Sequence, residues 1–137
     1  MAGEFSRLGK QRGADAADGR VSVSTYTPYI ALCSTAPTDS ALGGEYTATG
    51  YARQPVTFSA PTAADPPVAS NSGALTFGPF TANTGATLSY TMLMDGVSGG
   101  TATANMYVWW TLTTPKTPAN GDSATVATGA ITLSYTV

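Results

Sequence analysis

The side chains that could do chemistry are few and far apart in this chain of 137 residues. Histidine is absent, which removes the commonest general base and the catalytic triads built on it. Beyond residue 20 the carboxylates are spread over separate predicted loops, at Asp39, Glu45, Asp65, Asp95 and Asp122. A glycosidase site needs two carboxylates that flank one bond, and no acidic pair is close in sequence. We therefore expect no enzyme activity.

Metal and cofactor sites are not indicated either. Asp39, Asp95 and Asp122 could supply oxygen ligands to calcium, but their spacing is not that of a calcium-binding loop. The glycine-bearing stretch "GGEYTATGY" is not followed by a predicted helix, so it is not a phosphate cradle. Cys33 is the single cysteine, which excludes an internal disulfide and favours a small buried apolar residue. We expect no cofactor and no metal.

Predicted strands are the elements that would position these side chains. Hydrophobic runs with a period of two alternate with turn-forming residues, at 21–27, 29–34, 50–59, 73–80, 87–94, 105–113, 123–128 and 130–137. Pro55 interrupts one run, which makes that strand an edge strand or a bulged one. The pattern predicts an all-β fold: an antiparallel β-sandwich of about seven to eight short strands, preceded by an extended N-terminal arm.

Two of these runs show on which face their side chains should lie. Alternation over 87–94 predicts that one face of the strand carries the side chains of Leu88, Tyr90, Met92 and Met94. Over 105–113 it places Met106, Val108, Trp110 and Leu112 on the fully apolar face, so we expect Trp110 in the sandwich core. Trp109 shares the other face with Tyr107. It would either meet a neighbouring subunit or lie under the stiff loop 112–122, whose Pro115 and Pro118 are near in sequence.

The charge distribution divides the chain into a charged arm or linker, residues 1–20, and a β-sandwich domain, residues 21–137. Half of the charged residues lie in the arm. Phe5 and Leu8 are three apart, which suits one side of a short helix that Gly13 and Gly19 would limit. The arm is either a docking element or a disordered tail. As a docking element it should matter for attachment and little for folding.

Composition also excludes some partners. Only Arg53 and Lys116 are basic beyond residue 20, too few for phosphate binding, so we expect no nucleic-acid partner. No run of about 20 strongly apolar residues suggests a membrane span. The N-terminus also lacks the apolar segment of a secretory signal, which fits folding in a cytoplasm.

Three segments together resemble a known family. "YIALCSTAPTDSALGGEYTATGYARQPVTFS", "ALTFGPFTA" and "WWTLTTPKTPANGDSATVATGAITLSYTV" resemble, in order and spacing, a short tailed-phage virion domain labelled as tail-fibre-like or minor capsid protein. The resemblance covers about residues 29–137. It implies a structural protein of the virion, assembled in the host cytoplasm, whose partners are the major capsid protein, copies of itself, or both.

Two functions are consistent with this resemblance. One is a capsid decoration protein on the outside of the head shell, which uses its N-terminal arm to dock. The other is a tail-fibre or adhesin module that binds a host glycan or surface protein; the sequence has no heptad run for a trimeric stalk. The arm discriminates between them, because a decoration protein should use it against the capsid. The candidate interface residues are Phe5, Arg7, Leu8, Lys10, Arg12, Tyr107, Trp109 and Lys116.

Overall fold

The structure is a computed structural model that describes residues 3–19, 26–81, 84–96 and 106–134. Its elements follow one another in the order β1 (Glu4–Phe5), α1 (Arg7–Ala17), β2 (Tyr29–Cys33), β3 (Gln54–Pro55), β4 (Val68–Ser70), β5 (Leu75–Phe77), β6 (Leu88–Met94), β7 (Met106–Lys116), β8 (Ala124–Val126) and β9 (Thr132–Ser134). Every strand pairing among them is antiparallel. The predicted all-β class is confirmed. Most of the run predicted at 21–27 falls outside the described residues.

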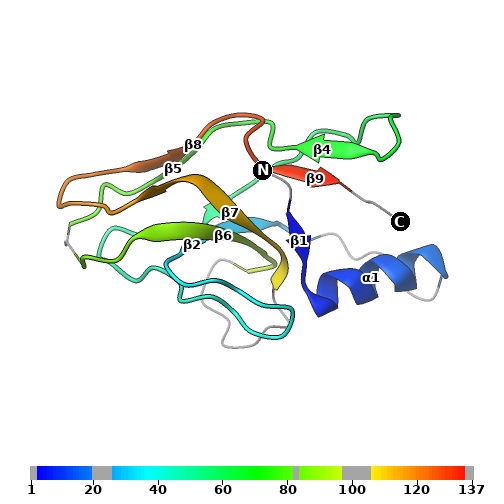
Figure 1. Cartoon of the computed structure of the whole chain (residues 1–137). Helices are drawn as coiled ribbons and strands as arrows, with labels where there is room; N and C mark the ends of the chain where they lie inside the picture. The colour runs from blue at the N-terminus through cyan, green and yellow to red at the C-terminus, as the bar shows by residue number, and fades with distance from the viewer. Residues whose placement is uncertain (1–2, 20–25, 82–83, 97–105, 135–137) are drawn as a thin grey trace.

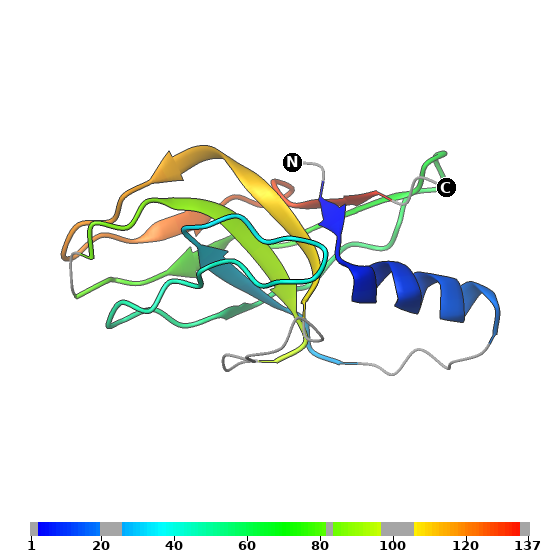
Figure 2. The ribbon, with the colours of Figure 1, turned by 60° about the horizontal axis from the view of Figure 1, so that its bottom comes forward.

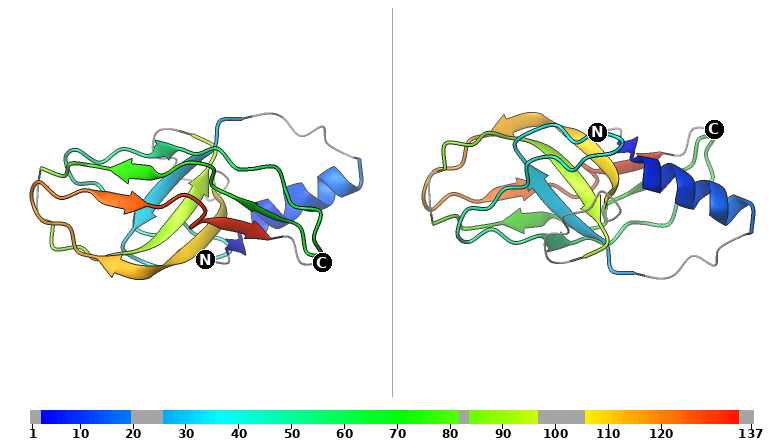
Figure 3. Two further views of the ribbon diagram at one scale, coloured as in Figure 1. Left: turned by 90° about the horizontal axis from the view of Figure 1, so that it is seen from above. Right: turned by 90° about the horizontal axis from the view of Figure 1, so that it is seen from below.

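The strands form two layers (Figure 1). One is a five-stranded sheet in the order β1-β7-β6-β2-β3, with the proline-containing β3 at one edge, as predicted. The pairs β4-β9 and β5-β8 form the other layer and lie over one face of that sheet (Figure 3). The main core fills the space between the layers. Its largest side chain is Trp110, which is fully buried and donates its indole N–H to the carbonyl of Thr132 over 2.9 Å.

Two irregularities in the β6–β7 ladder change the predicted faces. Leu93 pairs with Val108 but Met94 pairs with Met106, so Tyr107 is an extra residue on β7. Such a bulge reverses the facing of what lies beyond it. Met106 therefore packs on the outer face of the five-stranded sheet with Met94, and its predicted place beside Val108 and Trp110 is wrong.

The second irregularity lies at the other end of β6. Leu88 pairs with Lys116 while Tyr90 pairs with Thr111. Leu88 consequently belongs to the main core, whereas Tyr90 and Met92 pack on the outer face. The prediction that these three side chains share a face is wrong for Leu88, because strict alternation holds only where the two strands stay in register.

The N-terminal segment differs from the predicted extended arm. β1 joins the edge of β7, where Glu4 pairs with Trp109 and Phe5 with Val108. Ser6 then caps α1, since its hydroxyl accepts a hydrogen bond from the backbone N–H of Gly9. The helix continues through Gly13 and ends before Gly19, whose positive φ of 69° stops it. Packing against β7 compensates for the poor helix propensity of the glycines.

Candidate interface groove

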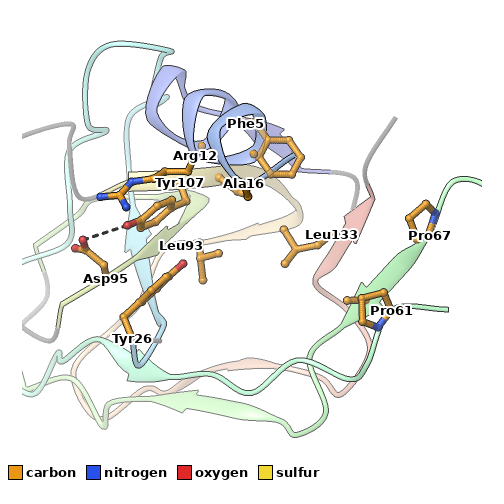
Figure 4. Close-up of a pocket in the computed structure, with 14 residues that line it drawn as sticks. Phe5, Arg12, Ala16, Tyr26, Pro61, Pro67, Leu93, Asp95, Tyr107 and Leu133 are labelled. Carbon is orange, nitrogen blue, oxygen red and sulfur yellow. Dashed lines mark hydrogen bonds between the residues drawn. The ribbon is translucent and has the colours of Figure 1, made fainter. Parts of the chain in front are cut away.

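An apolar groove lies at one end of the sandwich, between α1, the five-stranded sheet and the β4-β9 pair. Its volume is about 710 Å³. Figure 2 shows α1 at the end of the molecule from which β4 and β9 also project. The lining residues come from six segments that are apart in sequence (Figure 4): Phe5, Gly9, Arg12, Gly13, Ala16, Tyr26, Pro61, Pro67, Ala69, Leu93, Asp95, Tyr107, Val108 and Leu133.

The groove is open because the helix wall is made of small residues. Gly9, Gly13 and Ala16 are spaced four and three apart, so they share one face of α1. A side chain at Gly9 would collide with the backbone carbonyl of Tyr107, which shows how closely the helix approaches β7 there. Farther along the helix, Ala16 lines the groove, as does Leu133 on β9. The walls can therefore receive an apolar group from outside.

One end of the groove is polar and aromatic. The rings of Tyr26 and Tyr107 stack with centroids 5.1 Å apart and planes 14° apart. The hydroxyl of Tyr107 donates to the carboxylate of Asp95 over 3.4 Å. Arg12 reaches toward the same carboxylate from α1 (Figure 4). This end can offer aromatic faces, a guanidinium and hydroxyl donors to a partner.

Both tyrosines stay protonated near neutral pH. The pKa of Tyr26 is raised to about 12, mainly by burial and then by the negative charges that Tyr107 and Asp95 can carry, whereas Arg12 opposes the shift. Burial is also the main cause of the raised pKa of Tyr107, followed by Asp95. The groove therefore keeps neutral phenols beside one carboxylate over the physiological range.

The structure brings together three of the eight candidate interface residues. Phe5, Arg12 and Tyr107 all line the groove. Sequence reasoning missed Tyr26 and Asp95, their polar neighbours. Asp95 precedes Gly96 and reads as a turn residue, and no local pattern shows that this turn lies beside α1.

The basic residues at the start of α1 and at Lys116 lie elsewhere. Lys10 forms an exposed ion pair with Asp39 over 3.0 Å. Arg7 is exposed, and its backbone N–H donates to the carbonyl of Asp39. Lys116 donates to the carbonyl of Ser123 over 2.7 Å and lies 3.6 Å from the carboxylate of Asp122. Leu8 is half-buried, one turn before Arg12. None of these four lines the groove.

Trp109 lies on the outer face of the five-stranded sheet, away from the groove. It is half-buried against a cluster of fully buried residues, Ala31, Cys33, Met92, Met94 and Met106. Its ring meets Tyr90 edge to face at 6.5 Å. Its buried indole N–H has no hydrogen-bond partner among the described residues. A role for Trp109 in meeting a neighbouring subunit stays a prediction.

A second polar cluster is structural. The side chain of Arg53 is 1% exposed and forms two hydrogen bonds to Glu45, of 2.8 and 2.7 Å, and one to the carbonyl of Gly96. The hydroxyl of Tyr51 donates to Glu45 over 3.0 Å and accepts from the backbone N–H of Leu32. The hydrogen bonds to Glu45 raise the pKa of Arg53, and burial is the main cause of the raised pKa of Tyr51. The cluster pins the loop after β2 to the sheet.

The described residues were also compared with the requirements of a metal site and of a membrane-spanning helix. Within the described ranges, no three His, Cys, Asp or Glu side chains gather closely enough to hold a metal ion. In the same part of the chain, no helix is long and apolar enough to cross a membrane.

The described residues form an antiparallel β-sandwich with an apolar groove at one end. Comparison with family models places the chain among the structural proteins of tailed-phage virions. Residues 10–134 match the family described as "Podophage GP4 fiber I protein gp80", and the chain belongs to this family. No curated protein matches the chain. The protein is therefore a structural component of a phage virion, and the resemblance drawn from its sequence is confirmed at the level of the family.

Proposed function

We propose that the chain is a small building unit of a fibre on the phage particle, held there by contacts with other virion proteins and with copies of itself. The match to a fibre-protein family over residues 10–134 is the observation that carries this proposal. Assembly takes place in the host cytoplasm, where the buried thiol of Cys33 stays reduced.

The arrangement of the N-terminal segment favours a fibre over a capsid decoration protein. The decoration hypothesis depended on an extended arm that is free to reach between capsid subunits. In the folded chain, β1 and α1 instead pack on β7, with Ser6 and Gly9 buried. The major capsid protein is the alternative attachment point, but in residues 3–19, the described part of the N-terminal segment, the chain is folded against β7 and is not an extended arm.

The groove is the proposed attachment surface. Its walls are apolar, and its polar end has Arg12, Asp95 and two stacked tyrosines. A buried anchor side chain surrounded by a polar rim is the usual composition of a protein–protein contact. The partner would insert an apolar side chain beside Leu133 and place a hydrogen-bonding group near Tyr26.

The chain is proposed to have no catalytic activity, because three of its carboxylates, those of Glu45, Asp39 and Asp122, already accept hydrogen bonds within the fold. Glu45 binds Arg53 and Tyr51, and Asp39 binds Lys10. Asp122 accepts from the backbone N–H of Ala119, which lowers its pKa first, with Lys116 as the next cause. An acid or base catalyst needs a carboxylate that is free to exchange a proton with substrate.

Localisation on the particle tests the proposed function. Virions that carry an affinity tag on this chain should bind gold-labelled antibody at fibres. Label spread evenly over the head shell would overturn the fibre assignment in favour of capsid decoration.

A charge placed in the groove tests the attachment surface. Ala16 and Ala17 are both exposed on the last turn of α1, but only Ala16 lines the groove. A16K should lower the amount of chain on particles several-fold, whereas the matched control A17K should not, since a lysine suits the end of a helix equally at both positions. Equal incorporation of both variants would exclude the groove as the attachment site.

A further inference from the structure

β1 forms one edge of the five-stranded sheet. Among the described strands, β1 is the outermost of the order β1-β7-β6-β2-β3 and pairs with β7 alone. Immediately after it, the backbone N–H of Ser6 donates to the carbonyl of Tyr107 over 2.9 Å. Without this segment, the edge of β7 from Tyr107 to Trp109 would expose unpaired backbone groups, which is a template for any strand of suitable sequence.

The edge of β7 is shaped for this particular segment, residues 3–17. A side chain at Gly3 would collide with the indole of Trp110, and one at Gly9 with the carbonyl of Tyr107. Between them Ser6 is fully buried, and its hydroxyl donates to the carbonyl of Met106. Two glycines and a buried serine thus fit one stretch of β7. This stretch of β7 is therefore a surface that fits residues 3–17 specifically, in addition to offering backbone hydrogen-bonding groups.

The segment is joined to the sheet through residues 18–28, between the end of α1 at Ala17 and the start of β2 at Tyr29. A connection of this length can span at most about 35–40 Å when fully extended. That reach is comparable to the width of a small domain. A segment released from its own β7 could therefore dock on the β7 of an adjacent copy.

We propose that copies of this chain join by exchanging residues 3–17, so that the segment of one copy pairs with β7 of the next. Such an exchange repeats contacts that the folded chain already makes, and it needs no new complementary surface. It also places the groove between two copies, because Phe5, Arg12 and Ala16 form one wall and Leu93, Tyr107 and Leu133 the other. The proposal deepens the proposed function, on which it rests for the setting in a fibre.

The local concentration of residues 3–17 decides whether they pair with β7 of their own chain or with β7 of an adjacent copy. A short connection gives the segment an effective concentration in the millimolar range at its own β7. Dilute chains consequently keep it folded back. Chains packed along a fibre hold their neighbours' segments at a similar local concentration, so exchange can compete there.

A pair of cysteines reports which β7 the segment occupies. Arg7 and Asp39 are both exposed and are joined by a backbone hydrogen bond of 3.1 Å, so R7C and D39C lie within disulfide reach. The loss of the exposed Lys10–Asp39 ion pair costs little. Particles carrying the double variant are oxidised and the chain is run on a non-reducing gel.

Exchange predicts covalent multimers in the double variant that neither R7C nor D39C particles form. An intrachain disulfide in a monomeric band would overturn exchange. The wild-type chain, with only the buried Cys33, controls for unrelated disulfides. The failure of the proposed function and the failure of the exchange can be distinguished. If a reducing gel of wild-type particles lacks the chain, the proposed function is contradicted. If the chain is present but the non-reducing gel of the double variant shows only intrachain disulfides, the exchange alone is contradicted.

Three further variants keep the test decisive. Should R7C/D39C particles fail to assemble, K10C/D39C with a short bis-maleimide, which adds to both thiols, probes the same contact from the next turn of α1. Purified chain is also cross-linked at rising concentration with G9A or G73A added to the double variant. G9A should abolish the multimers, because its methyl group displaces the segment from β7, whereas G73A, where nothing lies within 4 Å, should not. Multimers that persist in G9A would overturn the proposal.

Discussion

The two faces of the five-stranded sheet are buried in different ways. The inner face packs against strands of the other layer, and its centre is Trp110, whose indole N–H is hydrogen-bonded to Thr132. The outer face holds a small cluster of Ala31, Cys33, Met92, Met94 and Met106, with Trp109 half-buried beside it. Adjacent tryptophans on one strand thus lie in a conventional core and in a smaller, sulfur-rich one.

The comparison teaches what each kind of burial depends on. The inner face is stabilised by apolar area and by close packing between layers. On the outer face, the bridge between Cys33 and Glu45 brings the loop after β2 alongside, and the buried Arg53 anchors Glu45. Stability of the inner face should therefore respond to side-chain volume, and stability of the outer face to charge.

The largest expected effect is on the inner face. Trp110→Ala should lower the free energy of unfolding by about 3–5 kcal/mol, because it leaves a large cavity and removes the hydrogen bond to Thr132. Trp109→Ala should cost clearly less. Urea unfolding of both variants measures this. A larger loss of unfolding free energy for Trp109→Ala would contradict this prediction. It would mean that the two side chains point to the faces opposite to those in this structure.

The anchor of the outer face should be nearly as sensitive. Glu45→Ala leaves the guanidinium of Arg53 buried without its counter-charge, and we expect a loss of about 3 kcal/mol in unfolding free energy. Asp39→Ala breaks the exposed pair with Lys10, whose side chains are 59% and 61% exposed, and should cost less than about 1 kcal/mol. Similar losses for the two variants would contradict the structural role of the Glu45–Arg53 pair.

Alkaline pH should act on the outer face through Cys33. Burial, followed by the charge of Glu45, raises the pKa of this thiol from 9.0 to about 12. Below pH 9 both folded and unfolded chains keep the proton, so the thiol has no effect on stability. As the pH rises from 9 toward 12, only the unfolded chain loses the proton, and stability falls by about 2 kcal/mol at pH 10.5.

Cys33→Ala isolates this contribution from that of the buried tyrosines. Unfolding free energies of the wild-type chain and the variant are compared at pH 7.5 and 10.5. The variant should lose less stability between these two values than the wild type. An equal loss would show that the thiol of Cys33 ionises normally in the folded chain.

The smallest expected effect on stability comes from removing the indole N–H group of either tryptophan. Trp110→Phe loses a hydrogen bond and should cost about 1 kcal/mol more than the same substitution at Trp109. Trp109→Phe removes a buried donor that has no partner among the described residues, so it should be close to neutral. Thermal unfolding of both phenylalanine variants would detect the difference, and a larger loss at Trp109 would indicate a partner for its N–H group.

The fold class and the core position of Trp110 could be predicted because each follows from local patterns. Period-two alternation, turn residues between runs and the absence of a helical pattern after residue 20 predict antiparallel β structure. Alternation around Val108 also places Trp110 inward. Pro55 cannot donate to a ladder, which predicted an edge strand or a bulged one, and β3 is an edge strand.

The bulge at Tyr107, the docking of the N-terminal segment and the groove were decided by tertiary structure. The bulge reversed Met106 because register depends on the partner strand, which no alternation within β7 specifies. Gly9 and Gly13 weaken a helix when judged by propensity, and the close approach of β7 is what requires a glycine at position 9. Phe5, Tyr26 and Asp95 line one groove because three separate segments converge at one end of the sandwich, and that convergence is a property of the assembled layers.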